Sequence, residues 1–231
     1  MWQRVGMDFN RRQMVLAGGV FAATSMLAGG VHKEVSGGRA PAAPRRAPVP
    51  PTVPAVPAAK PIVPPALMAA AKGALDRQGP SILRDRMAVV DFAAASSEPR
   101  LHLVDLLSGH VRSLQVTHGS GSDPDHSGWT KRFSNEAGSN ASSEGAFALR
   151  NYYIGKHGRS QRLAGLDASN SNALERAIVI HGAWYAEPSV ADATGKLGRS
   201  QGCFAVGDSR IDEVFDHLGS NRLLYAAKLT A

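Results

Sequence analysis

The residues of this sequence best suited to nucleophilic chemistry are its only cysteine, Cys203, and a histidine 22 positions upstream, His181. The cysteine ends the segment Ser200-Gln201-Gly202-Cys203, and the histidine follows a short apolar run at residues 177–180. A thiol attacks as its thiolate, and a free thiol has a pKa of about 8.5, so a neighbouring imidazole is needed to take the proton. We interpret Cys203 as a candidate nucleophile and His181 as its candidate base.

The glycines next to these two residues fit the same chemistry. Gly202 permits backbone conformations that other residues rarely adopt, so that its N–H and that of Cys203 could face a developing oxyanion. Gly182 has no side chain, and its carbonyl is one candidate acceptor for the imidazole N–H of His181. The competing interpretation is a buried cysteine and an unrelated histidine, because a lone cysteine is usually a small buried hydrophobe. Spacing alone leaves both interpretations open.

The elements that would position this pair are mostly strands. A period of two in the apolar residues predicts a mostly β domain with a few short helices over about residues 80–231. The expected strands cover residues 87–92, 100–106, 111–117, 145–155, 161–166, 177–181 and 222–229. Helices are expected over 66–79, where an apolar face would dock on the domain, and after Asp208. A strand, a loop and a second strand would bring residues 181 and 203 together.

A polar stretch at residues 118–145, rich in Gly, Ser, Asn and Asp, is expected to form a long loop. It carries His118, Asp123, Asp125 and His126, which are residue types that ligate metals. Their spacing is irregular, so we favour a polar loop over a metal site. Loops of this length in compact domains are often functional, and this one is a candidate lid.

The N-terminal part of the chain has the pattern of an export signal followed by a linker. Residues 1–30 combine basic residues, including the pair Arg11-Arg12, with an apolar run, which resembles a twin-arginine export signal. An uncleaved membrane anchor is the alternative, because the apolar run is close to the minimum length of a membrane span. Residues 31–65 contain ten prolines and are expected to be an extended Pro/Ala-rich linker. We therefore expect an exported protein of the periplasm or cell envelope.

The charge distribution argues against nucleic acid as a partner. The net charge is +7, but residues 1–65 hold 8 basic against 2 acidic residues, a charge of +6, which leaves 18 against 17 for the rest. The expected domain is therefore nearly neutral and lacks a basic stripe interleaved with aromatics. A single cysteine also excludes an internal disulfide and a multi-cysteine metal site. We expect no cofactor and no metal.

Several motifs in order resemble the L,D-transpeptidase (YkuD-type) catalytic domain, and in particular its murein L,D-transpeptidase branch. The signature of that family is a His-Gly or His-Ser followed by Ser-x-Gly-Cys, here His181-Gly182 and Ser200-Gln201-Gly202-Cys203. The branch adds three upstream motifs. They are here Phe133-Ser134-Asn135, Ser142-Ser143-Glu144-Gly145-Ala146-Phe147 and Tyr153-Ile154-Gly155-Lys156-His157-Gly158. The resemblance covers about residues 80–210.

The resemblance implies a β-sandwich or barrel and assigns roles to individual residues. It makes Cys203 the nucleophile, His181 the general base and Gly182 the source of the carbonyl that orients the imidazole. The oxyanion donors would be the backbone N–H groups of Gln201, Gly202 and Cys203. Further candidates for substrate binding are Arg199, Ser200, Tyr153, His157 and Trp184.

Two positions depart from the pattern of the commoner branch. That branch has His before the Gly-Cys and Arg or Asn two residues after the cysteine, whereas this chain has Gln201 and Ala205. A role of those side chains in holding substrate is therefore in doubt, and Arg199 or His157 would take it over. Trp184 and its neighbour Tyr185 are candidates for the wall of a cleft, with core packing as the alternative.

The resemblance implies acyl transfer on peptidoglycan stem peptides. Cys203 would attack the carbonyl of the third residue, release D-alanine and pass the acyl group to an amine, which gives a 3→3 crosslink or an attached protein. One alternative is an L,D-carboxypeptidase or endopeptidase, in which water resolves the thioester. A second alternative is a non-catalytic wall-binding module. We expect a monomer whose only membrane contact is made by its export signal.

Overall fold

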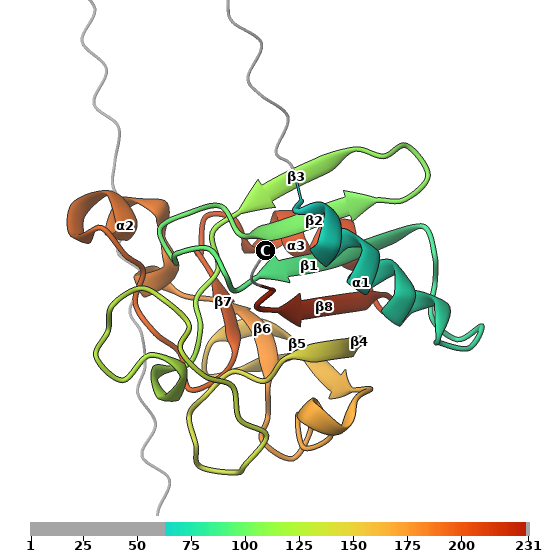
Figure 1. The fold of residues 1–231 in the computed structure, drawn as a ribbon. Coiled ribbons are helices and arrows are strands. Elements are labelled where there is room, and N and C mark those ends of the chain that lie inside the picture. The colour runs from blue at the N-terminus through green and yellow to red at the C-terminus, as the bar shows by residue number, and fades with distance from the viewer. Residues whose placement is uncertain (1–62, 230–231) are drawn as a thin grey trace, which may run out of the picture. The chain divides into compact units, whose positions relative to one another are not determined.

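The computed structural model of this chain describes residues 63–229, which fold as a mostly β domain with short helices at its surface (Figure 1). Its helices are α1 (Pro65–Asp76), α2 (Pro188–Thr194) and α3 (Ile211–Leu218). Its strands are β1 (Arg86–Asp91), β2 (Leu101–Asp105), β3 (Val111–Leu114), β4 (Gly145–Gly155), β5 (Gly158–Gly165), β6 (Val179–Gly182), β7 (Phe204–Val206) and β8 (Leu223–Ala227). The mostly β class predicted from the sequence is confirmed.

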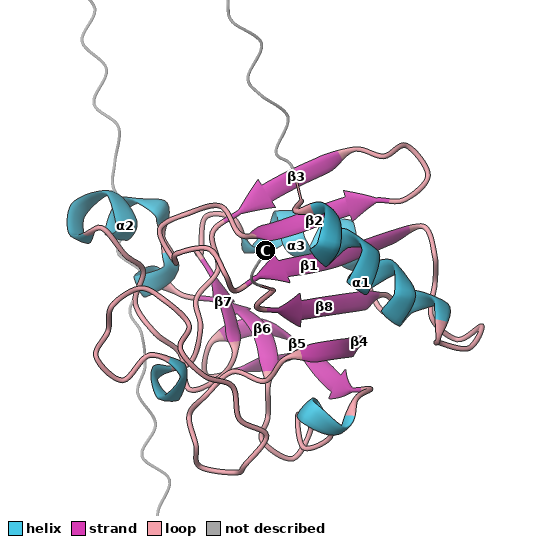
Figure 2. Cartoon of the chain, viewed as in Figure 1, coloured by secondary structure: helices cyan, strands magenta, loops and turns pink. Residues whose placement is uncertain are grey.

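All eight strands belong to one mixed sheet in the order β3-β2-β1-β8-β4-β5-β6-β7. Most neighbours are antiparallel, but β1 pairs with β8 and β6 pairs with β7 in parallel. Figure 2 shows long loops gathered around the ends of β6 and β7. The two strands that carry the expected site thus lie at one edge of the sheet, where loops can reach them.

The sheet curves strongly around an apolar core. Phe92, which follows β1, stacks on Phe204 of β7 with ring centroids 6.0 Å apart, although β1 and β7 are five places apart in the sheet. A flat sheet would separate two such strands by about 24 Å. Phe147 of β4 packs edge-on against Phe204 at 5.5 Å, and Val214 and Phe215 of α3 complete the same core. This curvature gives the domain a sandwich-like section, with apolar side chains of distant strands in contact.

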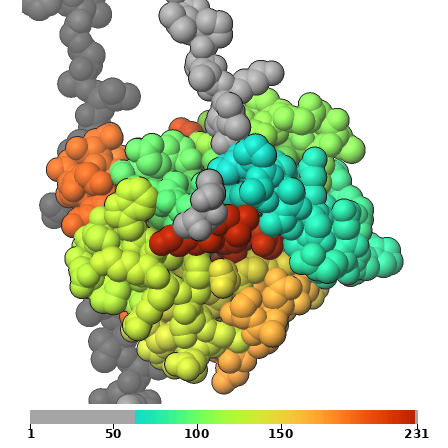
Figure 3. All heavy atoms as spheres, viewed as in Figure 1, coloured from blue at the N-terminus to red at the C-terminus, as the bar shows by residue number. Residues whose placement is uncertain are grey.

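The second face of the sheet is covered by α1. The helix begins at Pro65, a residue that suits a first helical position, and ends at Asp76, three residues before the end expected from the sequence. Leu67, Ala71, Ala74 and Leu75 are buried and pack with residues of β1, β4 and β8. Figure 3 shows α1, in cyan, on the surface beside the red C-terminal segment. The helix is therefore an integral layer of the domain.

Several expected elements differ in length from those observed. The strand expected over 111–117 ends at Leu114. Helix α2 was not expected, because its seven residues, which begin with Pro188, have no clear apolar period. Among residues 63–229, no helix combines the length and apolar character needed to cross a membrane. The expected export signal at 1–30 and nearly all of the linker at 31–65 lie outside the described residues.

The packing of α1 predicts a specific effect on stability. Leu67 is 1% exposed, so Leu67→Ala should lower the free energy of unfolding by about 3 kcal/mol, through lost apolar burial and the cavity left behind. Lys72→Ala, on an exposed position of the same helix, should leave it nearly unchanged. Urea unfolding of the two variants measures this. Equal stability of Leu67→Ala and the unsubstituted protein would show that α1 is not part of the cooperative unit.

Candidate active site

The parallel pairing of β6 and β7 brings the two candidate catalytic residues to the same face of the sheet. His181 lies opposite Ala205 and Ile180 lies opposite Phe204. Cys203 directly precedes β7, two positions before Ala205, so its side chain points to the same face as that of His181. Two residues along and one strand across correspond to roughly 8 Å between Cα atoms. Both side chains line one cavity.

This cavity has a volume of about 560 Å³ and is formed by segments from four parts of the chain. The β4–β5 hairpin contributes one wall, and the segment before β6 contributes a second. The remaining walls come from the polar loop and from the segment that leads to Cys203. Its lining residues are Ala137, Gly138, Asn140, Tyr153, Lys156, His157, Glu175, Arg176, Ala177, Val179, His181, Tyr185, Arg199, Ser200, Gln201 and Cys203.

The imidazole of His181 is held in one orientation and kept neutral. Its Nδ1 lies 2.7 Å from the carbonyl oxygen of Gly182, so the Nδ1–H donates to that carbonyl and the Nε2 lone pair remains available as a base. His157 stacks on the ring at 4.2 Å. The pKa of His181 is lowered to about 4, mainly by burial. The hydrogen bond to Gly182 acts in the opposite direction, and the nearby charges of His157 and Lys156 add to the lowering. At neutral pH the group is therefore an uncharged base.

The thiol of Cys203 rests mainly in its protonated form. Burial raises its pKa, while the Val179 N–H and the charges of Lys156 and Arg176 act in the opposite direction. The Sγ lies 3.7 Å from the carbonyl oxygen of Ala177, an acceptor for the S–H. A protonated thiol and a neutral imidazole in one cavity suit a reaction in which the proton is transferred as the thiol attacks, rather than beforehand.

Glycine is required directly before Cys203. Gly202 has φ +111°, and a Cβ there would lie 2.7 Å from the carbonyl oxygen of Ala141 and 2.9 Å from Ile178 Cδ1. The Gly202 N–H donates to Ser200 Oγ at 3.1 Å, and Ser200 Oγ–H donates to the Cys203 carbonyl at 2.7 Å. Ser200 therefore shapes the loop that presents the thiol.

These contacts narrow the choice of oxyanion donors. The amide of Gly202 is already engaged by Ser200. Within the described residues, no acceptor is paired with the backbone N–H of Gln201 or Cys203. Of the three amides implied by the resemblance, Gln201 and Cys203 are the two that can receive a developing negative charge.

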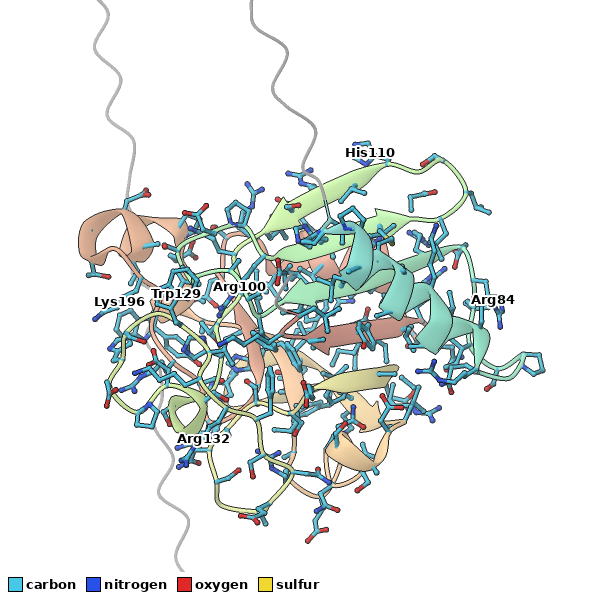
Figure 4. All side chains as sticks on the ribbon, viewed as in Figure 1. Arg84, Arg100, His110, Trp129, Arg132 and Lys196 are labelled. Atoms are coloured by element: carbon cyan, nitrogen blue, oxygen red, sulfur yellow. The ribbon has the colours of Figure 1, made fainter. Side chains whose placement is uncertain are left out.

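A buried charged network packs the polar loop on residues 199–203, the segment that leads to Cys203. Arg100, which Figure 4 labels, is fully buried. Its guanidinium approaches His118 Nδ1 at 2.9 Å, and His118 Nε2 lies 3.3 Å from Asp123 Oδ2. Because Arg100 is only a donor, His118 accepts at Nδ1 and donates from Nε2 to the carboxylate. The backbone of His118 then accepts from the Ser200 N–H at 3.0 Å. This network positions the loop that ends at Cys203.

No metal site forms among residues 63–229, where no three His, Cys, Asp or Glu side chains are grouped as ligands. Of the four residues weighed from the sequence, His118 and Asp123 are buried together, whereas His126 Nε2 donates to the Leu197 carbonyl and Asp125 pairs with Lys131. The described part of the loop thus uses these polar groups to hold itself in place.

Among the cavity residues to which sequence analysis gave no role are two cations, Arg176 and Lys156. Arg176 donates to the carbonyl oxygens of Ser134 and Ala141 and to the hydroxyls of Ser143 and Ser139, so it ties residues 134–143 to the cavity wall. These partners lie 33 to 42 positions upstream, a separation that no local pattern reveals. Lys156 lines the cavity from the β4–β5 turn. The Gly-Lys-His-Gly turn was its only signal.

The expected substrate-binding residues divide into two groups. Tyr153, His157, Arg199 and Ser200 line the cavity. Trp184 does not: it is 73% exposed and lies against Tyr185, which lines the cavity in its place. The tryptophan is therefore placed neither in the cavity nor in the core, the two locations considered for it.

Comparison with known families supports what the motifs indicate. The family model of the L,D-transpeptidase catalytic domain matches residues 59–227, which is well over half of the chain. The chain belongs to the L,D-transpeptidase catalytic-domain family. The match includes every strand of the sheet and every residue of the cavity. No curated protein matches the sequence.

Solved structures of L,D-transpeptidases are similar to this chain at low identity. One is L,D-transpeptidase 3 from Mycobacterium tuberculosis with a faropenem-derived adduct, at 9% identity and TM-score 0.41, covering 62% of this chain and 60% of that one. An L,D-transpeptidase from Mycobacterium smegmatis is 12% identical with a TM-score of 0.37, and the match covers 62% of this chain and 58% of that one. A further solved structure, the helical cell shape determining protein Pgp2 from Campylobacter jejuni, is 10% identical with a TM-score of 0.40, and the match covers 63% of this chain and 48% of that one.

The matched part covers 48% to 60% of the length of these three solved chains. At such identities and TM-scores, the likeness carries no conclusion about individual residues. Membership of the L,D-transpeptidase family rests on the family match over residues 59–227.

The lowered pKa values of the buried histidines predict that acid destabilises the domain. His118 and His181 each have a pKa of about 4 in the folded state, against 6.5 for an ordinary histidine. Between pH 6.5 and 4 the unfolded chain binds more protons, so the free energy of unfolding falls as the pH falls, by at most roughly 1.4 kcal/mol per pH unit for each histidine. Urea unfolding at a series of pH values measures the slope.

His181→Gln should reduce this slope by up to roughly 1.4 kcal/mol per pH unit, the contribution of one proton, because one of the two buried imidazoles is removed. The matched control is His110→Gln, at an exposed position before β3 that Figure 4 labels. A slope in His181→Gln equal to that of the unsubstituted protein would contradict the neutral, buried state of this imidazole.

Proposed function

We propose that this L,D-transpeptidase-family protein is a peptidoglycan L,D-transpeptidase that transfers the acyl group of a tetrapeptide stem to an amine. The observation that carries the proposal is the shared cavity of Cys203 and His181, in which an oriented neutral base and a thiol lie on adjacent strands. Membership of the family supplies the reaction class.

In the first half-reaction Cys203 Sγ attacks the carbonyl carbon of the third stem residue, which we propose to be meso-diaminopimelate. The thiol proton passes to His181 Nε2 as the S–C bond forms. The carbonyl oxygen becomes negative and is received by the N–H groups of Gln201 and Cys203. The C–N bond then breaks, the imidazolium returns the proton to the departing amine, and D-alanine leaves.

In the second half-reaction an amine attacks the thioester carbonyl. His181, again neutral, takes a proton from the amine as the new C–N bond forms. The C–S bond breaks, and Cys203 recovers a proton from the imidazolium. The product is a 3→3 crosslink when the amine belongs to another stem, or an attached protein when the amine belongs to a protein. Resolution of the same thioester by water would give the L,D-carboxypeptidase or endopeptidase alternative.

We also propose that the chain works outside the cytoplasm, in the periplasm or cell envelope. The support is its N-terminal sequence, in which Arg11-Arg12 precede an apolar run and a proline-rich segment follows. Such a linker would carry a monomeric domain toward its polymeric substrate.

Product analysis tests the proposed reaction. Incubation with a disaccharide-tetrapeptide should give crosslinked dimers and free D-alanine, and Cys203→Ala should abolish both, because the acyl carrier is lost. Liquid chromatography with mass detection identifies the products, and thermal unfolding confirms that the variant is folded. Dimers formed by Cys203→Ala would refute the role of the thiol. Tripeptide monomers in the presence of amine acceptor would assign the protein as a hydrolase.

The low pKa of His181 predicts an unusual pH profile. Because the imidazole stays neutral down to about pH 4, kcat/KM for release of D-alanine should remain high between pH 5 and 7. The acidic limb should have its midpoint near pH 4, provided that circular dichroism shows the protein to be folded there. A midpoint near 6.5 would mean that the base is not this buried imidazole.

A further inference from the structure

The cavity around Cys203 is lined by charged side chains of mainly one sign. Lys156, Arg176 and Arg199 contribute cationic groups, and Glu175 contributes the one carboxylate among the described lining residues. Cations around a thiol favour an anionic substrate group. The question is which of the three can bind a ligand.

Two of the three cations are occupied by the protein itself. The guanidinium of Arg176 makes four hydrogen bonds to carbonyls and hydroxyls of residues 134–143. Arg199 donates to the carbonyl oxygens of Asp123 and Pro124. Both groups hold loops in place, and moving either onto a ligand would take a donor from a carbonyl of a buried residue, Ala141 for Arg176 and Asp123 for Arg199.

Lys156 is the exception. It lies in the two-residue turn between β4 and β5, next to the His157 ring that stacks on His181. Among residues 63–229, no carboxylate, carbonyl or hydroxyl is hydrogen-bonded or ion-paired to its ammonium group. Its charge is close enough to both reacting groups to lower the pKa of His181 and of Cys203. A free, solvated cation thus lies at the rim of the reaction site.

We propose that Lys156 binds the free α-carboxylate of the C-terminal residue of the acyl donor, the residue that leaves as the amine. The inference rests on the proposed function, since it names the group that selects the donor at the same site. In a tetrapeptide this carboxylate is bonded to the carbon that carries the leaving nitrogen. A carboxylate so near the scissile bond would lie in the same cavity that Lys156, Cys203 and His181 line.

This contact makes Lys156 a determinant of specificity for the donor. A stem that ends directly after the scissile bond presents its carboxylate to the ammonium group. A donor whose C-terminus is an amide has no charge there, and a donor one residue longer places its carboxylate farther away. The enzyme should therefore prefer tetrapeptide acids over tetrapeptide amides. An exposed ion pair contributes up to about five-fold in kcat/KM.

The test compares paired substrates rather than absolute rates. A tetrapeptide acid and its C-terminal amide are supplied to the unsubstituted protein and to Lys156→Ala, Lys156→Arg and Lys72→Ala. Cleavage is followed by the tripeptide and crosslinked products, which both donors yield. The acid-to-amide ratio of kcat/KM should be about five for the unsubstituted protein, close to one for Lys156→Ala and largely kept in Lys156→Arg. The change should be in KM, and the ratio should fall as salt is added.

The ratio isolates the contact, because a shift in the pKa of Cys203 or His181 would change both substrates alike. Lys72→Ala removes the same charge from α1, outside the cavity, and should keep the full ratio. An unchanged ratio in Lys156→Ala, with normal turnover, would overturn the inference and leave the proposed function intact. Absence of turnover of either donor by the unsubstituted protein would overturn the proposed function itself.

Discussion

The parallel register between β6 and β7 is the constraint on which the site depends. His181 lies opposite Ala205, and Cys203 lies two positions before Ala205, just outside β7, so the thiol and the imidazole line the same cavity. A slip of one residue would turn one of the two side chains to the other face of the sheet. The register is held by the core beneath it, where Phe204 packs on Phe92 and Phe147.

Burial then sets the chemistry of the pair. The same low-dielectric surroundings that lower the pKa of His181 raise that of Cys203, so the resting site holds no separated charges. The loops around it do carry buried or partly buried charge, and they can do so because each charged group is hydrogen-bonded. Arg100, His118 and Asp123 form one such network, and Arg176 with the polar groups of residues 134–143 forms another. The site is thus a neutral centre inside a hydrogen-bonded frame, with Lys156 as a free cation at its rim.

The sequence predicted the elements that have a local signal. The long strand over 145–155 and the helix face at Ile211, Val214 and Leu218 follow from apolar periods of two and of 3.6 residues. It did not predict the parallel pairings, because pairing order depends on contacts between distant segments. It did not predict α2, because that helix is short and has no clear apolar period. The same limit applies to the cavity. Cys203 and His181 belong to a sequence motif, whereas Arg176 is held by partners more than thirty residues away in the sequence. Trp184 is of a residue type expected in a cleft, but its side chain is exposed to solvent.

The central claim is that Cys203 carries the acyl group of the donor. Acid-quenched intact-mass spectrometry during turnover of a tetrapeptide, without an amine acceptor, tests it most directly. The predicted result is a covalent adduct whose mass equals the donor less one D-alanine, mapped by peptide sequencing to Cys203. Release of D-alanine by a protein that stays unmodified throughout, or an adduct on a different residue, would contradict the account.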